Sequence, residues 1–366
     1  MTAAVDSFVA DVEALVSCES PSANTDALAR CADAIDAIAL RRIGMPAERM
    51  TTDGGRTHLR WQSGAPRVVL LGHYDTVWPI GTLARWPFAV DGDRMTGPGV
   101  FDMKVGVVQA FAALESLGFP DGAAVLLTSD EEVGSTSSRE LIEETCGGAA
   151  AVLVLEPSAD GALKVARKGV GMFRVDITGR AAHAGLDPHS GINATVEAAH
   201  QVLAIAQLAR DDIGTTVTPT VVSSGTTVNT VPASATVAVD VRAESVAEME
   251  RVTDALESLV PSVKGATVST VATSIRMPFE RKMSDALFTR AQRLAGTVGI
   301  DALDGVSVGG GSDGNLTAAL GIPTLDGLGA VGGNAHAEGE WASLAAVTQR
   351  TALVAAVVRE LLEETE

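Results

Sequence analysis

The sequence is short of cysteine and of aromatic residues, and it has no long hydrophobic run. Its three cysteines, Cys18, Cys31 and Cys146, are far apart and odd in number, which argues against a disulfide framework and predicts reduced thiols. No apolar segment approaches the roughly 18 residues of a membrane span. The first residues also lack the basic and apolar regions of a secretory signal. We therefore expect a globular protein of the cytoplasm.

Positive charge is scarce as well, because 27 lysines and arginines stand against 46 aspartates and glutamates. The resulting net charge of −19 argues against nucleic acid or an anionic membrane as a partner. A small anionic substrate fits this charge only where a metal ion, arginines or both supply local positive charge.

The first 160 residues alternate between apolar runs and helical patterns. Nearly continuous apolar runs are typical of buried parallel strands. The helical patterns cover 104–119, which ends near Gly118, and 137–147, where Ser137 and Glu140 predict a capping box. This alternation predicts an α/β domain with a mostly parallel sheet. The apolar runs are 67–72, 123–129 and 149–156.

The pattern changes after residue 160, where strand-like segments alternate apolar and polar residues as half-exposed strands do. The order of elements is βαββαβ, which is the ferredoxin-like arrangement. From about residue 278 the α/β pattern returns, with helices expected at 284–298 and 342–363. We therefore expect a discontinuous catalytic domain, 1–162 and 278–366, with an inserted lid or dimerisation domain at 163–277. The inserted elements are strands 163–180, 216–229, 233–243 and 266–275 and helices 190–210 and 245–260.

Polar residues with metal-binding side chains follow the apolar runs. His73 ends one run, and Asp75 points to the same side because residues i and i+2 of an extended chain do so. Asp102 precedes a helix in a glycine-rich loop, where an N-cap is the ordinary alternative. Glu156 ends the strongest apolar run, and His336 lies in a glycine-rich loop near the C-terminus.

These loops meet at one edge if the strands are parallel, because the ligand crevice of an open α/β sheet lies at the carboxyl ends of its strands. Histidine and carboxylate ligands without cysteine suit two zinc ions that share a bridging carboxylate. Asp75 is placed to orient a metal-binding imidazole. The stretch SDEEVGS adds Asp130, Glu131 and Glu132. Adjacent residues of an extended chain point in opposite directions, so we expect neighbouring acids here to have different roles.

The strings GHYDTVWP, GPGVFDMK, SDEEVGS, LEPS, GRAAHAG and NAHAEGEW resemble the two-zinc superfamily of aminoacylases, acetylornithine deacetylases, succinyl-diaminopimelate desuccinylases and glutamate carboxypeptidases. The resemblance runs from about residue 70 to residue 340. It implies a cis peptide bond after the bridging aspartate, and Co²⁺ or Mn²⁺ as substitutes for zinc. Val105 departs from the glycine that many members have there. The implied metal ligands are His73, Asp102 as the bridge, Glu132, Glu156 and His336.

The resemblance also implies how the remaining site residues act. Glu131 is the expected general base, which takes a proton from water and passes it to the leaving amine. Asp130 is expected to be a structural or solvated acid. His183 resembles the lid histidine that stabilises the oxyanion, and Asn229 a lid residue that contacts substrate; a surface histidine and a turn asparagine are the alternatives. In dimeric members these groups reach the partner's site, so a homodimer through the lid is expected.

Two arginines of the inserted segment match the glutamate carboxypeptidase branch in spacing. Arg242 and Arg276 are expected to bind the carboxylate of the substrate, although a strand-surface ion pair is the alternative for each. Gly310 and Gly311 are expected to offer backbone N–H donors to the same carboxylate. His58, His189 and His200 match no functional position, which suggests surface or packing roles.

The expected function is hydrolysis of the amide bond between an N-acyl or N-aroyl group, or a peptide, and a C-terminal amino acid such as glutamate. An N-acyl amino-acid deacylase or dipeptidase is the alternative on the same residues. Two further alternatives are a catalytically inactive relative that binds metal or peptide, and a structural oligomer with incidental metal. The acyl-group preference, the native metal and the physiological substrate do not follow from the sequence.

Overall fold

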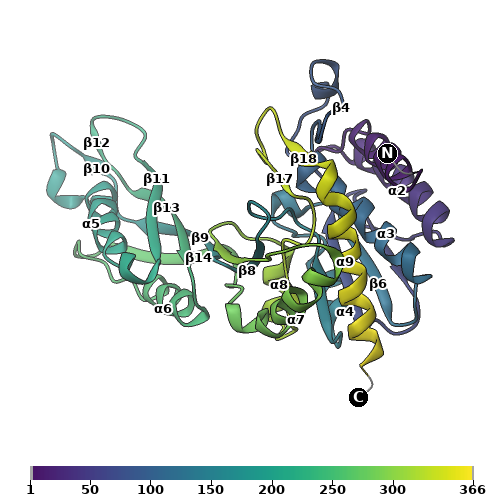
Figure 1. Ribbon diagram of the computed structural model, residues 1–366. Coiled ribbons are helices and arrows are strands. Elements are labelled where there is room, and N and C mark those ends of the chain that lie inside the picture. The colour runs from purple at the N-terminus through teal and green to yellow at the C-terminus, as the bar shows by residue number, and fades with distance from the viewer. Residues whose placement is uncertain (1–2, 365–366) are drawn as a thin grey trace. The chain divides into compact units, whose positions relative to one another are not determined.

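The structure is a computed structural model that describes residues 3–364, and the chain forms two units (Figure 1). The first unit contains the chain up to Ala166, Arg281–Ser307 and the chain from Ser312 onward. The second unit contains Arg167–Glu280 and Val308–Gly311. Among the described residues, no helix has both the length and the apolar character needed to cross a membrane.

A six-stranded sheet organises the first unit, in the order β1-β2-β6-β3-β7-β16. β3 pairs in parallel with β6 and β7, and β7 pairs in parallel with β16, whereas β1 and β2 pair antiparallel at one edge. Every residue of β3, β6 and β7 is buried, because helices cover both faces of a parallel sheet. The α/β class is thereby confirmed. The strands are β1 (Glu48–Thr51), β2 (Thr57–Gln62), β3 (Val68–His73), β6 (Ala123–Thr128), β7 (Ala151–Val154) and β16 (Thr324–Leu325).

Helices complete the core of the first unit, where α1, α2, α3 and α9 share one apolar cluster with the sheet (Figure 1). α3 ends at Gly118, whose left-handed φ of 70° suits glycine. The helices are α1 (Ala3–Val16), α2 (Thr25–Ile43), α3 (Val105–Leu117), α4 (Arg139–Cys146), α7 (Asp285–Ala295), α8 (Asp313–Ala319) and α9 (Leu344–Glu363). The short strands are β4 (Ala89–Asp91), β5 (Arg94–Thr96), β8 (Leu163–Arg167), β15 (Gly305–Val308), β17 (Gly332–Gly333) and β18 (Trp341–Ser343).

The predicted capping box of α4 is wrong. The helix begins at Arg139 after Ser138, which makes no side-chain cap. Ser137 instead donates from its backbone nitrogen and its hydroxyl to Asp130, each at 2.7 Å. Ser137 therefore hydrogen-bonds to the buried carboxylate of Asp130 in a neighbouring turn and does not cap the helix.

The second unit has a four-stranded antiparallel sheet in the order β11-β13-β9-β14. Alternate residues of β9 and β13 are buried, and α5 and α6 pack on the buried face (Figure 1). The element order β9-α5-β11-β13-α6-β14 is ferredoxin-like. The single strand predicted at 163–180 is wrong, because β8 ends at Arg167 and β9 begins at Gly169. The elements are β9 (Gly169–Thr178), β10 (Ala182–His183), α5 (Ala194–Ala206), β11 (Thr216–Ser224), β12 (Thr230–Val231), β13 (Ser234–Ala243), α6 (Val246–Glu257) and β14 (Thr267–Arg276).

Candidate active site

Five side chains of the first unit meet beyond the carboxyl ends of its parallel strands. His73 is the last residue of β3, Glu132 lies in the turn after β6, and Glu156 follows β7. Asp102 comes from the loop between β5 and α3, and His336 from the loop between β17 and β18. Parallel strands bring their ends to one edge, which is why residues far apart in the sequence converge here.

Asp102 lies between two histidine–glutamate pairs. His73 Nε2 lies 3.3 Å from Asp102 Oδ1 and 3.3 Å from Glu156 Oε1. His336 Nε2 lies 3.2 Å from Asp102 Oδ2 and 3.2 Å from Glu132 Oε1. Each carboxylate oxygen of Asp102 therefore faces a separate pair of one imidazole and one glutamate.

The clustered carboxylates create a strong demand for positive charge. Burial by itself lowers the pKa of His73, but the carboxylates of Asp102, Asp75 and Glu156 outweigh it and raise that pKa well above its ordinary value. Asp102 and Glu132 raise the pKa of His336 to about 10. Burial opposes ionisation of Asp102, yet the facing imidazoles hold its pKa below the ordinary range.

The donor set fits divalent metal ions. Imidazole nitrogens and carboxylate oxygens without thiolate are zinc ligands, and also suit Co²⁺ and Mn²⁺. Asp102 Oδ1 is buried and makes no hydrogen bond with any described residue, which leaves a lone pair for a cation. Ligand atoms of His73, Asp102 and Glu132 lie within 4.8 Å of one another, as do those of His73, Glu131 and Glu156. The peptide bond between Asp102 and Met103 is cis, as the resemblance implied.

Asp75 orients both the first histidine and the acidic turn. The backbone carbonyl of Asp75 accepts a hydrogen bond from His73 Nδ1 at 3.0 Å, so Nε2 faces the cluster. The buried carboxylate of Asp75 accepts hydrogen bonds from the Ser22 hydroxyl at 2.7 Å and from the backbone nitrogens of Glu131 and Glu132 at 3.2 Å. Asp75 is therefore a positioning residue in this structure.

The three consecutive acids have different environments. Asp130 is buried and accepts from Ser137, so the structural alternative expected for it is confirmed. Glu131 and Glu132 are half-buried and lie toward the cluster, where Glu132 Oε1 contacts His336 Nε2. His58 is a packing residue, because it is buried and its Nδ1 accepts from the backbone nitrogen of Ser129.

Glu340 is a site residue that sequence reasoning missed. Its buried carboxylate accepts from the backbone nitrogens of Gly99, Phe101 and Asp102 at 3.0, 2.8 and 2.9 Å and from the Trp78 indole at 2.9 Å. It thereby fixes the loop that presents Asp102. The available signal was an acid four residues after His336 in NAHAEGEW, but its partners are main-chain groups that no pattern displays.

Lys164 is a second missed residue. Its Nζ lies 3.5 Å from Glu156 Oε2, on the oxygen opposite to the one that faces His73. A cation at this point offsets part of the charge that the cluster concentrates. The sequence signal was weak, because a lysine in a short strand is ordinarily a surface residue.

His183 and Asn229 adjoin each other within the second unit. The backbone nitrogen of Ala184 donates to the Asn229 carbonyl at 2.9 Å, and β10 pairs with β12. His183 Nδ1 accepts from the backbone nitrogens of Gly185 and Leu186, each at 3.1 Å. The neutral ring therefore carries its proton on Nε2, which is an N–H donor. Both side chains are exposed, and His189 and His200 are exposed as well.

The two arginines differ in their surroundings. Arg242 forms a two-point contact with Asp240 on the same strand, at 3.0 and 2.9 Å, which is the ion pair given above as its alternative. Arg276 is buried at the end of β14. Gly310 and Gly311 present their carbonyls to Arg167 Nη1, at 3.0 and 3.3 Å. Their carbonyl oxygens thus attach this loop to Arg167.

An α/β fold with this donor set at the strand ends defines a metal-dependent hydrolase. The sequence profile of Peptidase family M20/M25/M40 matches residues 69–360, and the chain belongs to this family. Carboxypeptidase G2 of Pseudomonas sp. strain RS-16 is 30% identical over 373 residues, which cover 96% of this chain and 88% of that protein. Acetylornithine deacetylase of Myxococcus xanthus is 31% identical over 214 residues, which cover 54% and 55%.

Solved structures share the fold over nearly the whole chain. Aminopeptidase PepT from Bacillus cereus matches with a TM-score of 0.72 and 23% identity, covering 98% of this chain and 99% of that one. The metallo-carboxypeptidase Sso-CP2 from Sulfolobus solfataricus matches with a TM-score of 0.67 and 15% identity, covering 99% of both. At these identities the likeness concerns the fold alone.

Proposed function

We propose that this family member is a di-zinc carboxypeptidase that cleaves the amide bond between an N-acyl or N-aroyl group and a C-terminal amino acid, with glutamate favoured. The likeness to carboxypeptidase G2 over 96% of the chain supports this substrate class above that of the shorter deacylase matches. A carboxypeptidase, a deacylase and a dipeptidase would all use the same metal-binding residues. The choice among these activities therefore depends on the residues that bind the substrate.

The observation that carries the proposal is the position of Asp102 between two histidine–glutamate pairs. His73 and Glu156 would hold one ion, His336 and Glu132 the other, and Asp102 would bridge. Bound zinc supplies a Lewis acid for the scissile carbonyl and lowers the pKa of water. The buried, unbonded Oδ1 of Asp102 supports the bridging role.

Glu131 is the proposed general base. Its backbone is fixed by Asp75, and its side chain lies near His73 and Glu156. It takes one proton from the attacking water as the new carbon–oxygen bond forms. It returns that proton to the amide nitrogen as the carbon–nitrogen bond breaks, so the products are a carboxylic acid and an amine.

The second unit is proposed to act as a lid and dimerisation domain. His183 Nε2–H would donate to the developing oxyanion, and Asn229 would contact the substrate beside it. Arg276, with Arg242 released from Asp240, would hold the substrate carboxylate, and the loop of Gly310 and Gly311 would adjoin it. A homodimer, a small N-acylated substrate and a cytoplasmic location complete the proposal.

A chelator-controlled hydrolysis assay tests the proposal. N-aroyl and N-acyl substrates ending in glutamate, aspartate or leucine are compared with acetylornithine. We expect hydrolysis that a chelator abolishes and zinc restores, with glutamate fastest and the preference lost in Arg276→Ala. Equal rates across side chains favour a general deacylase. Failure to hydrolyse any substrate after zinc loading favours an inactive relative.

A further inference from the structure

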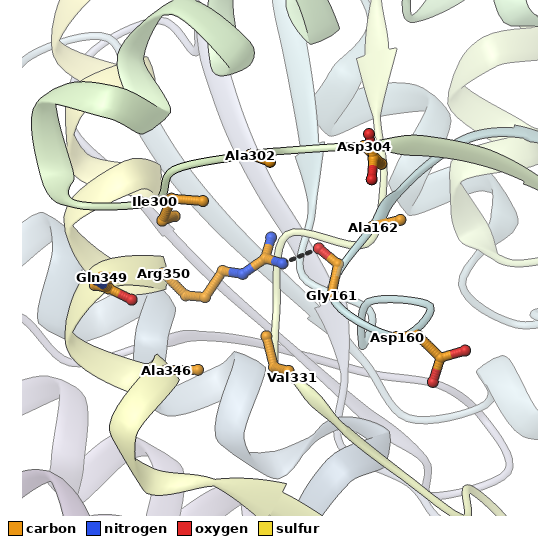
Figure 2. A pocket seen from close by; sticks show the side chains of 10 residues that line it. All are labelled: Asp160, Gly161, Ala162, Ile300, Ala302, Asp304, Val331, Ala346, Gln349 and Arg350. Carbon is orange, nitrogen blue, oxygen red and sulfur yellow. Dashed lines mark hydrogen bonds between the residues drawn. The ribbon is translucent and has the colours of Figure 1, made fainter.

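A cavity of about 220 Å³ lies in the first unit, away from the clustered metal-site residues, none of which lines it. Its walls are the loop before β8, the segment before β15, Val331 and the first turns of α9, as Figure 2 shows. The volume has room for about seven water molecules at ~30 Å³ each. It is smaller than the ~300–1,000 Å³ of sites for drug-sized ligands, so it suits a ligand of few atoms.

Arg350 supplies the positive charge of this cavity. Its side chain reaches from α9 toward the loop of Gly161, whose carbonyl accepts from Nη2 (Figure 2). The residue is only 5% exposed. Within residues 3–364, Arg350 Nη1 has no hydrogen-bond partner, and no acid offsets the effect of burial on this guanidinium. Its charge is therefore buried without a counter-charge.

Such an arrangement is costly without a ligand. A guanidinium has five N–H donors and keeps its charge, so burial without an acceptor leaves a desolvated cation. Burial alone lowers the pKa of Arg350 to about 10, with no acid to oppose the shift. The single backbone bond to Gly161 explains the position of Nη2 but leaves Nη1 unexplained.

The remaining charges of the lining are negative. Asp160 and Asp304 line the cavity with exposed side chains, whereas Arg350 is buried. Both carboxylates line the same cavity as Arg350, so they repel a simple anion there. A small molecule with one negative and one positive group matches the buried cation and the exposed acids together.

We propose that this cavity binds a free α-amino acid, with its carboxylate on Arg350 Nη1 and its ammonium group toward Asp304. Arginine–carboxylate hydrogen bonds are charge-assisted, which suits a guanidinium whose Nη1 has no partner among the described residues. The proposed site needs no metal ion and does not rest on the hydrolase assignment.

Isothermal titration of the full-length, metal-loaded protein tests the proposal with glycine as the probe. The matched probes are acetate, which lacks the ammonium group of glycine, methylamine, which lacks the carboxylate, and inorganic phosphate, which is an anion with neither group. We expect glycine to bind at least about tenfold more tightly than any of them, because only glycine pairs with both charges of the lining. Acetate or phosphate that binds as tightly as glycine would overturn the zwitterion assignment.

Variants identify the site. Arg350→Gln is expected to weaken glycine binding on the order of thirtyfold or more, and Asp304→Asn to weaken glycine but not acetate. Arg67→Gln is the matched control, because Arg67 also tethers backbone carbonyls, those of Leu362 and Glu364, but lies outside the cavity. Unchanged glycine affinity in a folded Arg350→Gln protein contradicts the proposal.

Two further readouts keep the test decisive. If Arg350→Gln does not fold, Asp304→Asn and the probe series on the unmodified protein still decide. The titration is repeated after chelation, where we expect the same glycine affinity as with metal. Glycine binding that disappears with the metal belongs to the metal cluster and overturns the assignment to this cavity.

Discussion

The carboxylate of Asp75 accepts a hydrogen bond from the backbone nitrogen of Glu131, with Oδ1 at 3.2 Å. The other oxygen accepts from the next residue of the turn and from the Ser22 hydroxyl. One buried acid thus sets the direction of both glutamates and adjoins His73. The different roles proposed for the two glutamates depend on this support.

Replacement of Asp75 tests that support. In Asp75→Asn one acceptor oxygen becomes a donor that faces a backbone N–H group, so the acidic turn loses a fixed contact. We expect kcat/KM or zinc affinity to fall by about 10–100-fold with little loss of folded protein. Ser22→Ala is the control and removes only one neutral donor. Asp75→Asn with wild-type kinetics and zinc affinity would remove Asp75 from the site.

Glu340 is predicted to be essential for the loop that presents Asp102. Glu340→Gln replaces one carboxylate oxygen with an NH2 group, which then faces two N–H donors, either those of Gly99 and Trp78 or those of Phe101 and Asp102. We expect a loss of ~1–3 kcal/mol of stability together with lower metal content. Glu338→Gln is the matched control, because that acid is 70% exposed on the same loop. Thermal unfolding and metal analysis are measured together. Equal midpoints for the two variants would contradict the prediction.

His183 is predicted to act on kcat more than on KM. Loss of an oxyanion donor costs about 10²–10³-fold in kcat, and we expect this for His183→Ala. His189→Ala is the control, because His189 is an exposed histidine of the same unit. Steady-state kinetics on one N-aroyl glutamate separate the two parameters. A change confined to KM would assign His183 to ground-state binding.

Low pH is expected to lower the stability of the second unit, because protonation of Glu248 weakens its contact with Arg251. The two-point contact with Arg251, at 2.8 Å to each oxygen, lowers the pKa of Glu248 to about 2. Because the folded pKa lies below the unfolded one, this carboxylate stabilises the fold above about pH 4.5 and loses its effect as the pH falls toward 2. We expect the wild type to have a higher midpoint of thermal unfolding than Glu248→Gln above pH 4.5, and this difference in midpoint to become smaller below pH 4.5. Glu257→Gln, on the same helix, is the control, and its difference in unfolding midpoint from the wild type should not shrink in acid. A difference between wild type and Glu248→Gln that grows in acid would contradict the role given to Glu248.

The sequence predicted the parts of the fold and site that depend on local pattern. Apolar runs located β3, β6 and β7, and the residue at the end of each run identified His73 and Glu156. The other three expected ligands, Asp102, Glu132 and His336, followed from loop motifs and from the family resemblance. These signals are readable because a buried strand and the loop after it are continuous in the chain.

Other features depend on tertiary partners and could not be predicted. Glu340 accepts hydrogen bonds from backbone nitrogens about 240 residues earlier in the chain. Its role therefore cannot be recognised until the fold brings that loop beside it. Ser137 does not form the predicted capping box, because its hydroxyl donates a hydrogen bond to Asp130. Arg350 has the sequence context of an ordinary helix arginine, and only burial beside Gly161 distinguishes it.

The central claim is that adjacent residues Glu131 and Glu132 divide proton transfer from metal binding. Metal content and turnover of Glu131→Gln and Glu132→Gln, measured on the same preparations, test it most directly. We predict that Glu131→Gln keeps the metal content of the wild type while turnover falls by about 10²–10⁴-fold, and that Glu132→Gln loses metal. An active Glu131→Gln protein, or equal loss of metal in both variants, would contradict the account.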